Sequence, residues 1–195
     1  MIVVDIETTG MHPERNSIVS IGAVDFENYG NTFYGECRVE EGLVIDPVSL
    51  QINGFTMKQI KDPAKPSGKE LLKEFSDWVS KIEDRTIAGD NIWFDTGFLE
   101  VKMKKFRIKW PFAKRTIELH MVSLLTEGLP WSLDLILKIV GIPERRGAHN
   151  ALEDALLTAE AISRLATGKG LLKKFSRHKV PDFIEEFAER AVAMS

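Results

Sequence analysis

Residues 2–7 read IVVDIE, and this short stretch decides the fold that we predict for the chain. Successive side chains of a strand point to opposite faces, so Val3, Asp5 and Glu7 share one face while Val4 and Ile6 share the other. Two carboxylates side by side on a strand of buried-type residues resist desolvation and repel each other. We therefore expect a core strand that carries two acids towards a compensating cation.

The residues that follow predict a three-stranded antiparallel meander and then alternating helices and strands. Two further runs rich in β-branched or aromatic residues predict strands, with the turn signal NYGN between them. After a loop that contains Pro47, NGFTMKQIKD is typical of a turn and a short helical segment. The elements expected are strands over 18–26, 31–39, 86–89 and 116–119, and helices over 67–82, 94–105, 133–140 and 151–166. This pattern predicts an α/β fold with a mixed central sheet flanked by helices.

Composition narrows the class of protein. The chain has 195 residues, of which 44% are hydrophobic and 28% charged, and a formal net charge of −3, which excludes a disordered chain. Its single cysteine, Cys37, cannot form an internal disulfide, so a reducing, cytoplasmic setting is the expectation. No apolar run is long enough for a membrane span, and the opening lacks the basic segment of a signal peptide.

We expect one main domain over 1–167 and a helical extension over 168–195 that is first basic and then amphipathic. TGKG breaks the preceding helix, and the last helix begins near Pro181. The apolar residues of this last helix fall on one face: Phe183, Ile184, Phe187, Ala188 and Ala191.

The chain contains two basic runs although its net charge is negative. Residues 101–115 carry seven positive charges and residues 169–179 carry five, in each case with no acid between them. Such runs are typical of either a phosphate-tracking surface or an ordinary solvated helix face.

Two acids besides Asp5 and Glu7 lie close to apolar segments. Asp95 is in the first turn of a helix that follows IAG and IWF, and Asp154 lies one turn into the helix over 151–166. His149 lies in the loop just before that helix, which leaves it free to turn towards Asp154. Hard carboxylate oxygens without thiolates favour Mg²⁺ or Mn²⁺ over zinc. Four negative charges would balance two divalent ions.

Three segments in this order, VDIETTG, AGDNIWFDTGFL and HNALEDA, resemble the three motifs of the DEDDh (DnaQ-like) 3′–5′ exonucleases. That group includes ribonuclease T and the proofreading subunit of bacterial DNA polymerase III. The resemblance runs from about residue 2 to 166 and implies a ribonuclease H-like fold with two-metal phosphodiester hydrolysis. It also implies that Asp5 contacts both metals, that Glu7, Asp95 and Asp154 complete the metal shells, and that His149 is the general base.

The same resemblance suggests residues that contact the terminal nucleotide. Core packing is the alternative for Met11 and Phe55, and a hydrogen bond to the backbone of its own turn is the alternative for Asn91. The candidates are Thr8, Thr9, Gly10, Met11, Phe55 and Asn91. The chain departs from the family at Asp90, where many relatives have histidine, and at Arg115–Thr116, where they often have DT.

The prediction is a metal-dependent 3′–5′ exonuclease that releases mononucleotides from single-stranded ends, with the basic runs guiding the strand. One rival is a proofreading subunit whose last helix docks on a polymerase through Phe183, Ile184 and Phe187; that helix could equally form a homodimer contact. A second rival is a catalytically silent nucleic-acid-binding module. The sequence does not separate DNA from RNA, because no motif encodes recognition of the 2′-OH.

Overall fold

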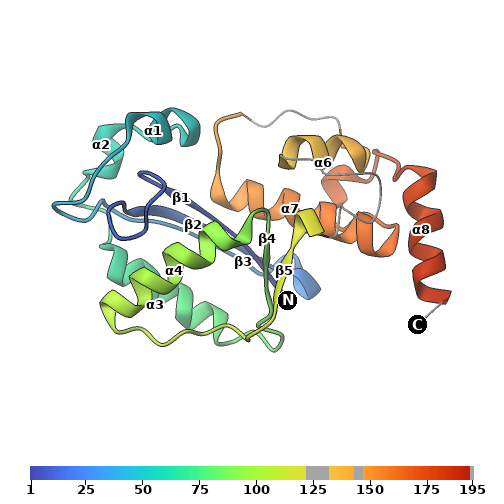
Figure 1. Ribbon diagram of the computed structural model, residues 1–195, viewed down its shortest axis with the longest axis horizontal. Helices are drawn as coiled ribbons and strands as arrows, with labels where there is room; N and C mark the ends of the chain where they lie inside the picture. The colour runs from blue at the N-terminus through green and yellow to red at the C-terminus, as the bar shows by residue number, and fades with distance from the viewer. Residues whose placement is uncertain (122–131, 143–146, 194–195) are drawn as a thin grey trace.

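The computed structural model describes residues 1–121, 132–142 and 147–193, and within them a mixed sheet forms the centre of the molecule (Figure 1). Its strand order is β3-β2-β1-β4-β5. The strands are β1 (Ile2–Thr8), β2 (Ile18–Asp25), β3 (Thr32–Glu36), β4 (Ile87–Gly89) and β5 (Thr116–Glu118). The pairs β1–β2 and β2–β3 are antiparallel, whereas β1–β4 and β4–β5 are parallel. The predicted meander, mixed sheet and α/β class are confirmed.

Helices cover both faces of this sheet. On one face lie α3 (Gly68–Val79) and α4 (Ile92–Phe106), and on the other lie α6 (Leu133–Ile139) and α7 (Ala151–Thr167) (Figure 1). Further elements in the described residues are α1 (Pro47–Asn53), α2 (Met57–Ile60), α8 (Asp182–Ala193), and the 3₁₀ turns η1 (Phe26–Asn28) and η2 (Lys173–Phe175). None of the helices in the described ranges combines the length and apolarity that crossing a bilayer requires.

The alternation predicted for β1 divides the core into two clusters. Val4 and Ile6 pack with the side chains of α3 and α4, among them Leu72, Phe75 and Phe98. Val3 packs instead with Leu137 of α6 and with Leu157 and Ile162 of α7. Asp5 and Glu7 therefore face the side of the sheet that α7 covers.

A helix, α1, replaces the loop expected around Pro47. The Asp46 side chain accepts a hydrogen bond from the Val48 amide, Pro47 occupies the first turn, and Gly54 ends the helix in the left-handed region at φ 71°. An N-cap aspartate followed by proline is a local helix-start signal that the sequence prediction passed over.

Strand β3 is shorter than the range 31–39 predicted for it. The amides of Arg38 and Val39 donate to Pro66 O and Ile60 O rather than to β2. The chain leaves the sheet because the segment around α2 supplies these acceptors, and this pairing is not visible in the local sequence.

The chain after α7 packs into the core cluster shared by α6 and α7. Gly168 ends α7 at φ 68°, as TGKG predicts, and Leu172, Phe175 and Val180 are buried in that cluster. The boundary at 167 stays a prediction, since these contacts join the extension to the rest of the chain.

Ile184 of α8 is fully buried in the same cluster, so the expectation that it belongs to an exposed docking face is wrong. The helix packs against the end of α7, where Ala188 lies beside Gly168, and of the residues of the expected face whose side chains the structure describes, Phe183 is exposed. The side chains of Phe187 and Ala191 lie outside the described residues.

A buried ion pair anchors this part of the chain. Arg164 Nε lies 2.6 Å from Glu160 Oε1, and the two side chains are 1% and 0% exposed. The same guanidinium donates to Val140 O at the end of α6 and to Phe175 O. Glu160 Oε2 accepts from the amides of Leu171 and Leu172. A charge pair with this many partners is satisfied in spite of its burial.

Candidate active site

Strand β1 delivers two acids to a cavity of about 260 Å³. Asp5 and Glu7 line it from the face predicted for them, and Glu7 is only 7% exposed. A larger cavity, of about 470 Å³, lies around Arg38 and Lys61 and shares no lining residue with this one. The acids therefore belong to the smaller cavity.

Asp95 reaches the same cavity from the first turn of α4. Its Oδ1 accepts a hydrogen bond of 2.9 Å from the Ile6 amide. Strand β4 ends at Gly89, so the Ile6 amide lies beyond the part of β1 that pairs with β4. It donates to the Asp95 carboxylate instead of to a neighbouring strand. Burial raises the pKa of Asp95 well above its usual range, and the negative charges of Asp90 and Glu7 raise it further. A cation placed among these groups would relieve that repulsion.

The N-terminus of α7 brings in Asp154 and His149. Asp154 is 2% exposed, and its Oδ2 lies 3.7 Å from His149 Nδ1. His149 also lines the cavity, and its backbone N–H donates to Ile52 O at the end of α1 at 3.0 Å. The residue is thus tied to α1 through its main chain, while its side chain faces Asp154, the direction expected from the sequence.

A glycine lets α7 come this close to the sheet. Gly22 of β2 is the register partner of Asp5, and a Cβ at Gly22 would lie 2.1 Å from the Ala151 carbonyl carbon. Such a distance leaves no room for any side chain, so the start of α7 rests directly on the β2 backbone. The absence of this side chain sets how near Asp154 lies to the acids of β1.

The donor set matches a divalent cation that prefers oxygen ligands. Ligand atoms of Glu7, His149 and Asp154 all lie within 4.8 Å of one another. Asp5 and Asp95 line the cavity beside them. Carboxylates with one imidazole and no thiolate suit Mg²⁺ or Mn²⁺. These residues fit the cation that the sequence predicts.

Three of the predicted nucleotide-contacting residues line the cavity, namely Thr8, Met11 and Asn91. Met11 is 65% exposed, so the alternative of core packing does not hold for it. The Thr8 hydroxyl donates to Gly10 O at 2.7 Å. Their contacts with substrate stay predictions.

Thr9 and Gly10 belong to the framework of the loop and are not among the residues that line the cavity. The Thr9 hydroxyl donates to Val44 O and accepts from the Ser17 amide, and Thr9 is fully buried. A Cβ at Gly10 would lie 2.4 Å from Asn16 Nδ2, so glycine is required there by a neighbouring side chain. The sequence cannot reveal this, because the partners lie 6 to 35 residues away.

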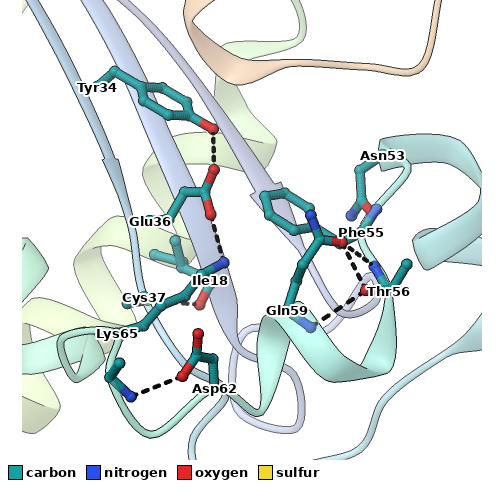
Figure 2. A network of polar contacts seen from close by, with 11 residues as sticks. Ile18, Tyr34, Glu36, Cys37, Asn53, Phe55, Thr56, Gln59, Asp62 and Lys65 are labelled. Carbon is teal, nitrogen blue, oxygen red and sulfur yellow. Dashed lines mark hydrogen bonds and ion pairs between the residues drawn. The ribbon is translucent and has the colours of Figure 1, made fainter.

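Phe55 also lies outside the cavity lining, in the connection between α1 and α2 (Figure 2). Its amide donates to Asn53 Oδ1, and Lys65 Nζ lies 5.1 Å from the centre of its ring. A cation over the ring gives Phe55 a partner within the protein.

Several residues of the site escaped the sequence prediction. Asn53 lines the cavity and its side-chain amide donates to Thr8 O at 3.1 Å, which joins α1 to the end of β1. Glu118 accepts from the amides of Asn91 and Ile92, at 2.9 and 2.8 Å. This carboxylate of β5 caps the N-terminus of α4, and the helix therefore begins at Ile92, two residues before the predicted start at 94.

The turn before α4 is held by a second polar cluster. The Asp90 carboxylate lies 3.1 Å from His120 Nε2, and Asn91 adopts a left-handed conformation at φ 52°. Asparagine tolerates this region better than most residues. The departure from the family at Asp90 therefore has a local partner on the segment that follows β5.

Parts of the two basic runs can be placed along the helices relative to these acids. Lys104 is nine residues beyond Asp95 on α4, a rise of about 14 Å, and the second run begins after α7 ends, about 20 Å along the helix from Asp154. Lys102 is buried and lies 2.7 Å from Glu40, which also pairs with Lys105. Guidance of the strand into the cavity by these runs stays a prediction.

The chain is similar to known nucleases in both sequence and fold. The model of the RNase_T family, described as exonuclease, matches residues 2–162. The chain is 27% identical over 184 residues to the 3′-5′ DNA exonuclease Cap18 of Escherichia coli, covering 90% of this chain and 96% of that protein. It is 29% identical over 190 residues to DNA polymerase III PolC-type of Thermotoga maritima, covering 94% of this chain but only 13% of that much longer protein. The crystallographic structure of the nuclease domain of 3′hExo, a DEDDh family member, bound to rAMP, shares the fold with a TM-score of 0.70 at 21% identity, covering 88% of this chain and 94% of that one.

Proposed function

The chain belongs to the RNase_T exonuclease family, which makes it a 3′–5′ exonuclease, and we propose that it hydrolyses the terminal phosphodiester bond of single-stranded nucleic acid with the aid of two divalent cations. The observation that carries this proposal is the meeting of Asp5, Glu7 and Asp95 with the His149–Asp154 pair at one cavity. These groups come from a strand, two helices and a loop.

In the proposed arrangement Asp5, Glu7, Asp95 and Asp154 hold Mg²⁺ or Mn²⁺. Bound there, the cations supply a water of lowered pKa and neutralise the charge that develops on the phosphate. The four carboxylates would balance the charge of two such ions, and this would relieve the repulsion that adds to burial in raising the pKa of Asp95.

His149 is the proposed general base. Its Nδ1 faces Asp154 at 3.7 Å, which leaves Nε2 to accept the proton of the attacking water. The water oxygen forms the new bond to phosphorus as the bond to the 3′ oxygen of the preceding nucleotide breaks. The side chain is 41% exposed, so the proton it accepts can pass on to solvent.

The surroundings of the cavity favour an unpaired strand. Met11 and Ile52 line the cavity and are 65% and 50% exposed, and Trp93, which is 67% exposed, precedes the cavity-lining Phe94 on α4. Apolar and aromatic side chains exposed in this way stack against unpaired bases. A duplex keeps its bases stacked inside and offers them no such contact.

The experiment is a time course on single-stranded DNA and RNA of identical sequence, each labelled at the 5′ end, with Mg²⁺, Mn²⁺ or EDTA. We expect a ladder that shortens from the 3′ end only when metal is present, and the faster polymer identifies the substrate. Asp5→Ala, purified in parallel, controls for contaminating nucleases. Strand binding without cleavage by the wild-type protein would favour the silent binding module instead.

The similarity to DNA polymerase III PolC-type favours a second candidate, removal of mispaired nucleotides during synthesis. A primer–template with a mispaired 3′ end, compared with its paired counterpart, tests it. Preferential excision of the mispaired nucleotide supports proofreading, whereas preference for a free single strand opposes it.

A further inference from the structure

The last turn of α1 lies against the segment that leads into α7 (Figure 1). The His149 N–H donates to Ile52 O at 3.0 Å. Gly54, which ends α1, comes so near to the same segment that a Cβ on it would lie 2.9 Å from Ala148 Cβ. Two successive residues, 148 and 149, therefore meet the end of α1, one by close approach and one by a hydrogen bond.

The same turn of α1 is fastened to the strand that carries two of the acids. Asn53 is buried, and its side-chain amide donates at 3.1 Å to Thr8 O, next to Glu7 in β1. The Asn53 Oδ1 accepts from the Phe55 amide at 3.1 Å, in the connection seen in Figure 2. Because both ends of this side chain are hydrogen-bonded, the turn keeps a fixed place relative to β1.

Helix α7 holds the histidine from the other side. The His149 Nδ1 lies 3.7 Å from Asp154 Oδ2, and the next residue, Asn150, caps the helix by accepting from the Glu153 amide at 3.1 Å. The main chain of His149 is thus held between the end of α1 and the cap of α7. Its distance from the β1 acids depends on how closely the segment approaches α1.

We propose that Gly54 is a positioning residue for His149. Without a side chain at Gly54, residues 148 and 149 lie directly on the last turn of α1, which directs the imidazole to Asp154. Gly54 is not among the residues that line the cavity, so it acts through Ala148 and not on the substrate. This inference rests on the proposed function, in which His149 accepts the proton of the attacking water.

Gly54→Ala tests the role, because the new methyl group must push Ala148 away by about 0.5 Å to reach ordinary contact at 3.4 Å. A displacement of about 1 Å at a reacting centre lowers the rate roughly a hundredfold, so we expect a kcat lower by roughly tenfold. KM for the strand and the Mg²⁺ concentration for half-maximal rate should stay at their wild-type values, since the β1 acids do not move.

Gly42→Ala is the matched control. Gly42 has a φ of 76° and Gly54 one of 71°, so alanine is strained at both positions, but a Cβ at Gly42 meets nothing within 4 Å. Both variants should melt lower than wild type, and only Gly54→Ala should lose kcat. Asparagine tolerates this conformation better, so Gly54→Asn takes the place of Gly54→Ala if the alanine variant does not fold.

Ala148→Gly supplies the second test, because it removes the atom that the new methyl group would meet. The double variant Gly54→Ala, Ala148→Gly should recover the kcat of Ala148→Gly alone. A double variant as slow as Gly54→Ala would overturn the inference, since contact with Ala148 would then not be the cause of the loss.

His149→Ala separates this inference from the proposed function. Adding Gly54→Ala to His149→Ala should lower the rate no further, and a second tenfold loss would overturn the positioning role. If His149→Ala is slow while Gly54→Ala turns over like Gly42→Ala, the positioning role fails and the exonuclease proposal stands. If His149→Ala is fully active, the general base itself is wrong and the positioning role falls with it.

Discussion

Replacing Gly22 by alanine should damage both stability and catalysis, because α7 rests on the bare backbone at this position. The new Cβ would lie 2.1 Å from the Ala151 carbonyl carbon and from the Leu152 nitrogen. Ordinary contact begins at 3.4 Å, so the helix must retreat by about 1.3 Å. The obstructing atoms are backbone and cannot swing aside as a flexible side chain would.

The size of both effects follows from that displacement. Overpacking of a core costs about 1–3 kcal/mol, which corresponds to a melting temperature lower by roughly 2–12 °C in a chain of this length. The retreat also carries Asp154 and His149 away from the β1 acids. A misplacement of about 1 Å at a reacting centre lowers the rate roughly a hundredfold.

The assay pairs thermal unfolding with single-turnover release of the 3′-terminal nucleotide. Gly97→Ala is the matched control, because a Cβ on this α4 glycine meets nothing within 4 Å and alanine is the better helix former. We expect that control to melt slightly higher than wild type with unchanged turnover. If Gly22→Ala melts and turns over like wild type, the account of how α7 is seated is refuted.

Three further perturbations follow from the structure. Saturating Mg²⁺, at about a hundred times its dissociation constant, should add about 2.7 kcal/mol and raise the melting temperature by roughly 5–10 °C over EDTA; an unchanged melting temperature would contradict the metal site. Arg164→Met leaves the buried Glu160 carboxylate without its cation and should lower the free energy of unfolding by about 3–5 kcal/mol in urea titration, whereas the exposed Arg177→Met should change it little; equal values for the two variants would show that the buried pair is dispensable. Burial acts to raise the pKa of Glu40, but hydrogen bonds and charges from Lys102 and Lys105 outweigh it, so its pKa is lowered in the folded protein. Its stabilising contribution is therefore present above the unfolded value of about 4.3 and lost as the pH falls through the folded value, so melting temperatures below about pH 4.5 should fall more steeply in wild type than in Glu40→Gln; parallel curves would contradict this.

The parts of the fold that the sequence predicts correctly rest on local patterns. The alternation of residues 2–7 predicts two faces of the strand, one with Val3, Asp5 and Glu7 and the other with Val4 and Ile6. The structure places these two groups on opposite faces of the sheet. The start of α7 follows from its N-cap, Asn150, and its end from Gly168, because both signals act within one helical turn.

The parts that escaped prediction depend on residues distant in sequence. Glu118 starts α4 from 26 residues away, and Glu40 neutralises Lys102 from 62 residues away, which turns part of an apparently basic surface into a buried pair. Gly22 looks like any strand glycine until α7 is placed on it. Periodicity and spacing carry no information about such contacts, whereas α1 had a local signal in Asp46 and Pro47 that was overlooked.

We propose that this acid-lined cavity removes 3′-terminal nucleotides with His149 as the base. Its most direct test is the rate at which wild type and His149→Ala release the last nucleotide of a 5′-labelled single strand in Mg²⁺. The account predicts metal-dependent release by wild type and a rate roughly two to four orders of magnitude lower in the variant. A variant as fast as wild type, or a wild-type protein that releases nothing in Mg²⁺ or Mn²⁺, would contradict it.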